Sequence, residues 1–215
     1  NKNEILGDKV IRQALAYAVD KEQILAAALN GDGNIVEGPI LPGFLGYAPE
    51  LKSYDYNPQK AADMLIEDGW ELDGDYLAKD DEQLAITITT VDSGENVKAV
   101  ELLQRFWQNI GINTQIEIIP PSQIQQEKII PRDYQVLVFG ITICYDSDPY
   151  PFWHSSQREH PGVNLTSYGN RQTDQMLEEA RQTTDPEVRS DKYLAFQGII
   201  AEDVPAIFLY SPTYT

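Results

Sequence analysis

The residues best suited to chemistry stand in one short stretch, where Asp146 and Asp148 lie two positions apart beside Pro149. Two carboxylates that converge can act as an acid and base pair or hold a metal ion. Asp-x-Asp is also common in acidic proteins, and no nucleophile with a neighbouring base accompanies it. We therefore predict no catalytic residue and no enzymatic activity. A hydrolase that uses Asp146 and Asp148 remains an alternative.

The other candidate metal ligands are two histidines and one cysteine. His154 and His160 lie in a proline-rich segment and lack the helical spacing of zinc-binding histidine pairs, so we interpret them as surface residues. Cys144 is alone, which excludes an internal disulfide and a zinc site with paired thiolates. The twelve-residue ligand pattern of a calcium loop is absent as well. We expect no metal site and no cofactor.

A binding interpretation uses the same stretch, residues 145–153, which we call the predicted ligand segment. Its side chains offer hydrogen bonds, charge and an aromatic platform, and Asn164 follows a few positions later. The alternative is structural: aspartates beside prolines begin turns, an aromatic residue anchors a loop, and a buried asparagine satisfies backbone groups. The predicted ligand-binding residues are Tyr145, Asp146, Asp148, Trp153 and Asn164.

Composition and charge restrict the classes of partner. The 215 residues are 42% hydrophobic and 23% charged, as in ordinary globular proteins. The formal net charge is -18, which repels phosphate backbones and anionic lipid headgroups, so we expect no nucleic-acid partner. No apolar run approaches the roughly 20 residues that span a bilayer. The first residues, Asn1 to Glu4, do not resemble a signal peptide, so we expect a longer precursor or parent polypeptide.

Apolar spacing predicts helices that alternate with strands. Asp8 caps the first predicted helix, residues 9–29, and Asn30-Gly31 ends it. Residues 31–58 show neither a helical nor an alternating period. Further predicted helices cover residues 58–68, 95–110, 122–130 and 171–184, and one begins at Pro186. Predicted strands cover residues 84–91, 112–118, 136–143 and 206–210.

This alternation is typical of an α/β fold with a mixed sheet flanked by helices. The run from Val136 to Ile143 is apolar on both faces, as expected of a central strand covered on each side. In open sheets of this class, ligands bind beyond the carboxyl ends of strands. We expect one α/β domain over residues 1–215, with the predicted ligand segment after its central strand.

Several separate stretches together resemble one family. They are Arg12 to Lys21, the pair Pro39 and Pro42, Tyr54 to Pro58, Asp68 to Trp70, Gly111-Ile112, Asp133-Tyr134, Asp146 to Pro149, Asn164, Tyr168, Asn170, Asp174, Arg189, Gln197, Asp203, Pro205 and Leu209-Tyr210. Each match is short, but their order and spacing agree over nearly the whole chain. On these residues the chain is similar to the family 5 extracellular solute-binding proteins, which serve ABC importers of oligopeptides, dipeptides, nickel complexes and some sugars.

The resemblance implies a periplasmic binding protein-like (type II) lobe, the second lobe of a two-lobe receptor. The first lobe and a final tail of the same polypeptide would be absent. It further implies an extracytoplasmic lipoprotein, at the periplasm or the outer face of the cell membrane, anchored by an absent N-terminal lipid. Its expected partners are an oligopeptide or other small solute and the permease subunits of an ABC transporter. A ligand-sensing lobe of a transcription regulator is the alternative.

In peptide-binding members of the family, an aspartate four positions before the proline of the Asp-Pro pair holds the free amino group of the peptide. Tyr145 stands at that position here, whereas Asp146 precedes Pro149 by three positions and Asp148 precedes it by one. Ile141 also replaces a tryptophan of the family. These departures leave open whether the cargo is a peptide, a sugar or a metal complex.

Overall fold

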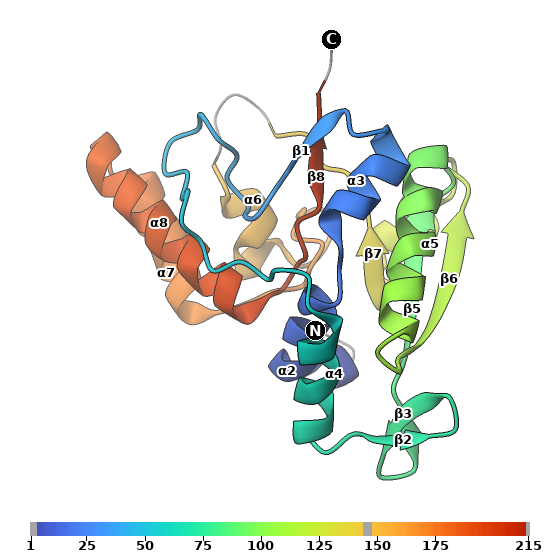
Figure 1. Cartoon of the computed structure of the whole chain (residues 1–215). Coiled ribbons are helices and arrows are strands. Elements are labelled where there is room, and N and C mark those ends of the chain that lie inside the picture. The colour runs from blue at the N-terminus through green and yellow to red at the C-terminus, as the bar shows by residue number, and fades with distance from the viewer. Residues whose placement is uncertain (1–3, 144–147, 214–215) are drawn as a thin grey trace. The chain divides into compact units, whose positions relative to one another are not determined.

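A computed structural model describes residues 4–143 and 148–213, which form two compact units (Figure 1). The sheet unit comprises residues 4–35, 54–140 and 209–213. The helical unit comprises residues 36–53, 141–143 and 148–208. Each unit therefore combines segments that are distant in the sequence. A single domain over residues 1–215 stays a prediction.

Three parallel strands form the centre of the sheet unit. Strand β5, Ala85–Val91, lies between β6, Asn113–Ile119, and β7, Val136–Val138. Both neighbours pair with it in parallel, so that Thr90 lies opposite both Ile118 and Val138. The predicted α/β class is confirmed, and the strands at residues 84–91 and 112–118 are found within one residue of their predicted bounds.

The prediction of a central strand over residues 136–143 is wrong in both the position of the strand in the sheet and its length. Residues 136–143 are strand only over Val136–Val138, and β7 forms an edge of the described sheet while β5 is central. A doubly apolar run predicts burial on both faces, but Phe139 and Ile141 are 41% and 49% exposed. Apolar character alone therefore did not distinguish a central strand from an exposed extended segment.

Helix α5, Gly94–Gln108, connects β5 to β6 and covers the sheet (Figure 1). Ser93 caps its start by accepting a hydrogen bond from the Asn96 amide. Its buried face contains Ala99, Leu103, Phe106 and Trp107. The Trp107 indole Nε1 donates to the Leu15 carbonyl at 3.1 Å, which joins α5 to the amino-terminal helices.

The single helix predicted over residues 9–29 is two helices, α2 (Lys9–Tyr17) and α3 (Lys21–Leu29), which follow the short α1 (Glu4–Gly7). Asp20 has extended backbone angles and its carboxylate accepts from the Gln23 amide, so it begins a new helix. The apolar stripe continues across this break, which is why spacing alone predicted one helix. Asp8 and Asn30 bound the pair as predicted, with Asn30 in the left-handed region at φ 53°.

Helix α4, Pro58–Glu67, begins at the predicted residue, after a cap at Asn57 whose side chain accepts from the Lys60 amide. After it comes an antiparallel meander that the sequence did not predict: β2 (Glu71–Asp73), β3 (Tyr76–Lys79) and β4 (Glu82–Gln83). These strands are too short and too charged to show a period of two.

The predicted strand at residues 206–210 instead lies at Tyr210–Pro212 as β8, which pairs antiparallel with an unpredicted β1, Gly33–Ile35. The weak helix predicted at residues 122–130 is a π-helix over Gln125–Ile129.

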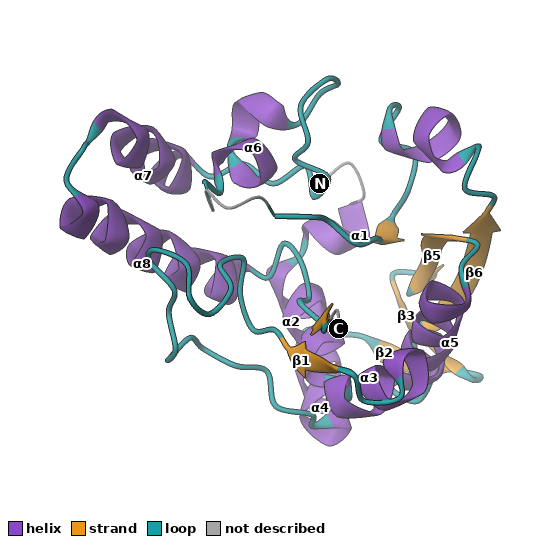
Figure 2. Cartoon of the chain, turned by 90° about the horizontal axis from the view of Figure 1, so that it is seen from above, coloured by secondary structure: helices purple, strands orange, loops and turns teal. Residues whose placement is uncertain are grey.

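Two long helices dominate the helical unit and lie side by side (Figures 1 and 2). They are α7, Arg171–Gln182, and α8, Pro186–Asp203, with the short α6, Tyr150–Trp153, against α7. Pro186 takes the first position of α8, as predicted, and Asp185 caps the helix. In residues 4–143 and 148–213, no helix has both the length and the apolar content to cross a bilayer.

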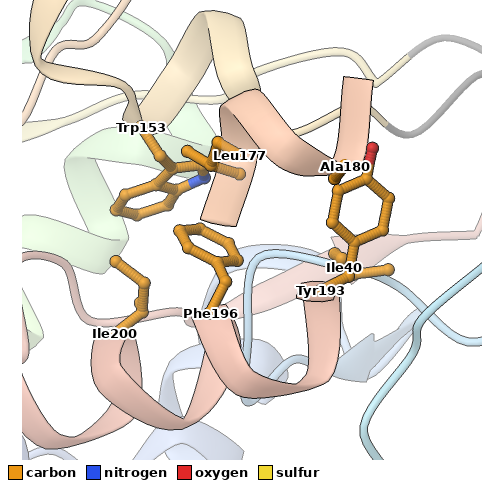
Figure 3. Close-up of a cluster of buried hydrophobic side chains, with 7 residues drawn as sticks. All are labelled: Ile40, Trp153, Leu177, Ala180, Tyr193, Phe196 and Ile200. Atoms are coloured by element: carbon orange, nitrogen blue, oxygen red, sulfur yellow. The ribbon is translucent and has the colours of Figure 1, made fainter. Parts of the chain in front are cut away.

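The helical unit has its own hydrophobic core (Figure 3). Phe196 is fully buried at its centre, beside Trp153 from α6 and Leu177 from α7. The complete set is Ile40, Trp153, Leu177, Ala180, Tyr193, Phe196 and Ile200. Ile40 comes from residues 36–53, which therefore form an arm on α8 rather than a free loop.

Gly46 lets this arm approach α8 closely. A Cβ atom at Gly46 would lie 2.6 Å from Tyr193, and its φ of 77° disfavours other residues. The Gln197 side chain donates to the Gly46 carbonyl at 2.6 Å from within the core. Residues 36–53, which show no periodic pattern, are thus fixed by contacts with α8 and not by regular secondary structure of their own.

We expect Phe196→Ala to lower the free energy of unfolding by about 3–5 kcal/mol, because it leaves a cavity in this core. Leu194→Ala, on the same helix at a side chain that is 40% exposed, should cost less than about 1 kcal/mol. Urea denaturation of both variants checks the difference. Equal losses would contradict the placement of the core.

Asp20→Ala should destabilise the protein by about 1 kcal/mol, because the start of α3 loses its cap. Asp20→Asn keeps an oxygen that can accept from the Gln23 amide, so it should retain most of the stability. Thermal unfolding followed by circular dichroism compares the two variants. An equal loss in both variants would show that the charge of Asp20, and not its capping hydrogen bond, matters at this position.

Candidate functional site

The described part of the predicted ligand segment begins at Asp148, which lies in a dense set of polar contacts. One carboxylate oxygen, Oδ1, accepts from the Tyr150 amide at 3.0 Å and so holds the entry to α6. The other, Oδ2, receives Nε of Arg181 at 2.7 Å and its Nη2 at 2.6 Å. Asp148 is therefore an ion-paired turn residue in this structure.

Arg181 also stacks on the aromatic ring of Tyr150. Its guanidinium carbon lies 3.7 Å from the centroid of the Tyr150 ring. On the same tyrosine, the His154 ring stacks with centroids 4.2 Å apart and an interplanar angle of 14°. Cation–π contacts of arginine on tyrosine are favourable, and more so when water is partly excluded. The stack connects α7 to the start and end of α6.

His154 is buried, with 6% of its surface exposed, so its prediction as a surface residue is wrong. Its Nδ1 accepts from the Ser156 amide at 3.1 Å, which caps the short 3₁₀ turn Ser155–Gln157. Its Nε2 faces Glu178 at 3.2 Å and Asp174 at 3.8 Å. A neutral ring that accepts at Nδ1 carries its proton at Nε2 and donates it to Glu178. His160, by contrast, is exposed as predicted.

Ser156 Oγ lies 2.8 Å from the same Nδ1, so a serine, a histidine and a carboxylate stand in sequence. This is a cap and not a nucleophile with its base, because the Ser156 amide already occupies Nδ1. The Asp174 carboxylate is similarly used, since it accepts from the amide and the hydroxyl of Ser155 at 2.9 and 2.5 Å. Among residues 4–143 and 148–213, no group of three or more His, Cys, Asp or Glu side chains could hold a metal ion.

Asn164 organises the chain that follows. It is fully buried, and its Nδ2 donates to the carbonyls of His154 at 3.2 Å and Tyr168 at 3.0 Å. Its Oδ1 accepts from the Thr166 hydroxyl at 2.9 Å. Both ends of the Asn164 amide thus have hydrogen-bond partners within the loop. This agrees with the structural alternative, in which a buried asparagine satisfies backbone groups.

Tyr168 closes the loop on α8. Its hydroxyl donates to Oδ2 of Asp203 at 2.7 Å, and Nδ2 of Asn170 donates to the same oxygen at 3.3 Å. Burial, together with the hydrogen bond to Asp203, raises the pKa of the Tyr168 hydroxyl above its usual range. The neutral phenol is therefore favoured, which is the form that donates to Asp203.

Trp153 is 5% exposed and belongs to the core of the helical unit (Figure 3). Its ring lies 6.2 Å from that of Phe196 and 5.8 Å from that of Phe208, measured between centroids. The indole is largely covered within its own unit and anchors α6. Trp153 thus has the structural role that the sequence offered as an alternative to ligand binding, that of an aromatic residue that anchors a loop.

The predicted site residues thus have different positions. Tyr145 and Asp146 lie outside the described residues. The structure brings Asp148, Trp153 and Asn164 into one network around α6 and the loop that follows it. Sequence reasoning missed Arg181 as the partner of Asp148; a basic residue in the last turn of a predicted helix was the only local signal, and it did not indicate a contact 33 positions away.

Comparison with known proteins identifies the family. The sequence profile described as bacterial extracellular solute-binding proteins, family 5 Middle, matches residues 1–161. The oligopeptide-binding protein AppA of Bacillus subtilis is 33% identical over 218 residues, which cover 98% of this chain and 40% of AppA. Its solved structure, in complex with a nonapeptide, superposes with a TM-score of 0.89 at 32% identity and covers 98% of this chain and 43% of that one.

Other similar proteins agree with this family assignment. The dipeptide-binding protein of Escherichia coli is 25% identical over 97% of this chain and 38% of its own length. The structure of NikZ from Campylobacter jejuni in complex with Ni(L-His) has a TM-score of 0.85 at 27% identity, covering 98% of this chain and 43% of that one. The chain spans about two fifths of the length of the relatives that it matches. By its sequence profile and its fold, the chain belongs to the bacterial extracellular solute-binding proteins of family 5.

Proposed function

We propose that the protein containing this chain is the substrate-binding component of an ABC importer and that its cargo is oligopeptides. The observation that carries this proposal is the similarity to the oligopeptide-binding AppA, at 33% identity over 98% of the chain. The dipeptide-binding relative and the nonapeptide complex support a peptide ligand as well. The partners are then the permease subunits of the importer, and the protein works outside the cytoplasm as an anchored receptor.

Capture without chemistry is the expected mode of action. Receptors of this kind enclose ligand between two lobes by hinge motion. This chain would supply one lobe, and the remaining polypeptide of the full receptor would supply the other. The caps and ion pairs around α6 use the polar groups of Asp174, His154 and Asp148 internally, which supports binding over hydrolysis.

We assign the direct contacts with ligand to Tyr145 and Asp146, and the support of the segment to Asp148, Trp153 and Asn164. The assignment rests on what each side chain already binds: Asp148 is paired with Arg181, Trp153 lies in the core, and the Asn164 amide is satisfied by the backbone and Thr166. A carboxylate at Asp146 would attract the amino terminus of a peptide.

Peptide capture can be tested with the full-length protein and a pool of peptides of two to nine residues. We expect native mass spectrometry to show one retained peptide per protein, with its mass unchanged after incubation. Peptides released in cleaved form would contradict binding without chemistry. Retention of nickel–histidine complexes or sugars in place of peptides would contradict the proposed cargo.

Asp146→Asn should lower the affinity for the retained peptide by about 30-fold or more, because removing one member of a desolvated charge pair costs roughly 2–5 kcal/mol. Asp191→Asn, at an exposed carboxylate of α8, is the control for net charge and should bind as the wild type does. Isothermal titration calorimetry measures both variants. Equal affinity of wild type and Asp146→Asn would remove Asp146 from the site.

The isolated 215-residue chain should bind the same peptide only weakly, because one lobe lacks the closing contacts and water exclusion that give affinity. Circular dichroism first establishes that the chain is folded. Submicromolar affinity of the chain alone, beside the full-length protein in the same titration, would contradict the two-lobe mechanism.

A further inference from the structure

The arm, residues 36–53, runs beside α8 (Figure 1), and an open groove of about 410 Å³ lies between the arm and the first two turns of the helix. Five residues of the helical unit line it: Leu45, Pro186, Glu187, Ser190 and Asp191. The close packing of Gly46 on Tyr193 and the hydrogen bond from Gln197 hold the arm against α8. This arm–α8 groove therefore has walls that are fixed before any partner binds.

Both elements that form the groove expose an apolar side chain. Leu45 of the arm is 40% exposed, and so is Leu194 of α8. Leu194 follows Asp191 by three positions and Glu187 by seven, so it lies on the same face of the helix one turn further along. Single exposed leucines are common at protein surfaces. A leucine from each element beside a preformed groove, however, gives a partner a place to bury apolar atoms.

The charges of α8 are separated by face. Its basic side chains point to α7, where Arg189 Nε donates to a backbone carbonyl at 3.1 Å and Lys192 pairs with a glutamate at 2.5 Å. On the face with the groove, Glu187 and Asp191 are exposed, and neither has an ion-pair partner within residues 4–143 and 148–213. Like charges four positions apart on a helix repel each other. A cation from a partner would remove that repulsion.

The charge of the whole chain decides which partner fits this face. The formal net charge is -18, so anionic lipid headgroups and a second copy of the chain are both repelled. A protein segment that carries arginine or lysine beside apolar side chains is attracted, because its cations can pair with Glu187 and Asp191 while its apolar atoms enter the groove. Charge complementarity thus selects a basic, amphipathic protein segment.

We propose that the arm–α8 groove is a docking surface for the permease subunits of the importer, and that it receives a basic, amphipathic segment on their outer face. This inference rests on the proposed function, because a substrate-binding component has to deliver its cargo to the permease. Complementary charges fix the orientation of two proteins and raise their rate of association. None of the residues that line the groove is among those assigned to ligand contact.

The test measures binding of the peptide-loaded, full-length protein to the permease subunits of its importer in nanodiscs of neutral lipid. We expect Asp191→Lys to lower the affinity for the permease by about 10-fold at low salt, and Leu194→Ala by about 5-fold. Glu67→Lys and Ile66→Ala are matched controls at exposed positions of α4, and they should bind as the wild type does. The affinity for peptide, measured by calorimetry, should be unchanged in all four variants.

Salt dependence and surface labelling give two further readouts. High salt should weaken binding of the wild type to the permease more than binding of Asp191→Lys, because salt screens attraction between exposed charges. In hydroxyl-radical labelling followed by mass spectrometry, Leu45 and Leu194 should be labelled in the free full-length protein and protected in its complex with the permease. Ile66 should be labelled equally in both.

The outcomes separate the docking surface from the proposed function. Equal affinity of Asp191→Lys and Glu67→Lys for a permease that the wild type binds would overturn the docking surface alone. Protection of Leu45 and Leu194 in the free protein, self-association that Leu194→Ala abolishes, or equal binding to nanodiscs without permease would each assign the groove to another occupant and overturn it as well. A wild-type protein that retains peptide but binds no permease would overturn the importer function, and the docking surface with it.

Discussion

The indole of Trp153 has to be covered, because a side chain of its size would expose a large apolar surface if it remained in water. Helix α6 has only four residues and cannot hold a conformation through its own hydrogen bonds. Its place is therefore set by the insertion of Trp153 beside Phe196 and Leu177, in the core that α7 and α8 form. The polar contacts of the region depend on that insertion, since each needs α6 to lie against α7.

Around Trp153, the buried polar groups have hydrogen-bond partners. The buried members, His154, Asn164 and Thr173, bond to backbone groups of the loop or to neighbouring side chains. Such networks define a conformation because an unpaired buried group would cost free energy. The ion pair of Arg181 with Asp148 lies outside this buried layer, at side chains that are 44% and 24% exposed, where such pairs contribute little to folding.

The comparisons separate scaffold from specificity. A complex with a nonapeptide and one with Ni(L-His) superpose on this chain with TM-scores of 0.89 and 0.85, so the same backbone accompanies different ligands. A shared scaffold cannot by itself select among them. In our proposal the selection falls to the predicted ligand segment, where Tyr145 departs from the pattern that the sequence resemblance implies, and Ile141 departs from it shortly before the segment.

The sequence by itself determined the elements whose signals are local. Caps at Asn57, Ser93 and Asp185 act on amides within three residues, so α4, α5 and α8 begin within one residue of where the sequence predicts. It also indicated the family, because many short motifs keep their order. The tertiary structure alone decided that β7 lies at an edge, that His154 is buried and that Asp148 binds Arg181. Those features depend on which distant surface covers a residue, and neither spacing nor composition records that partner.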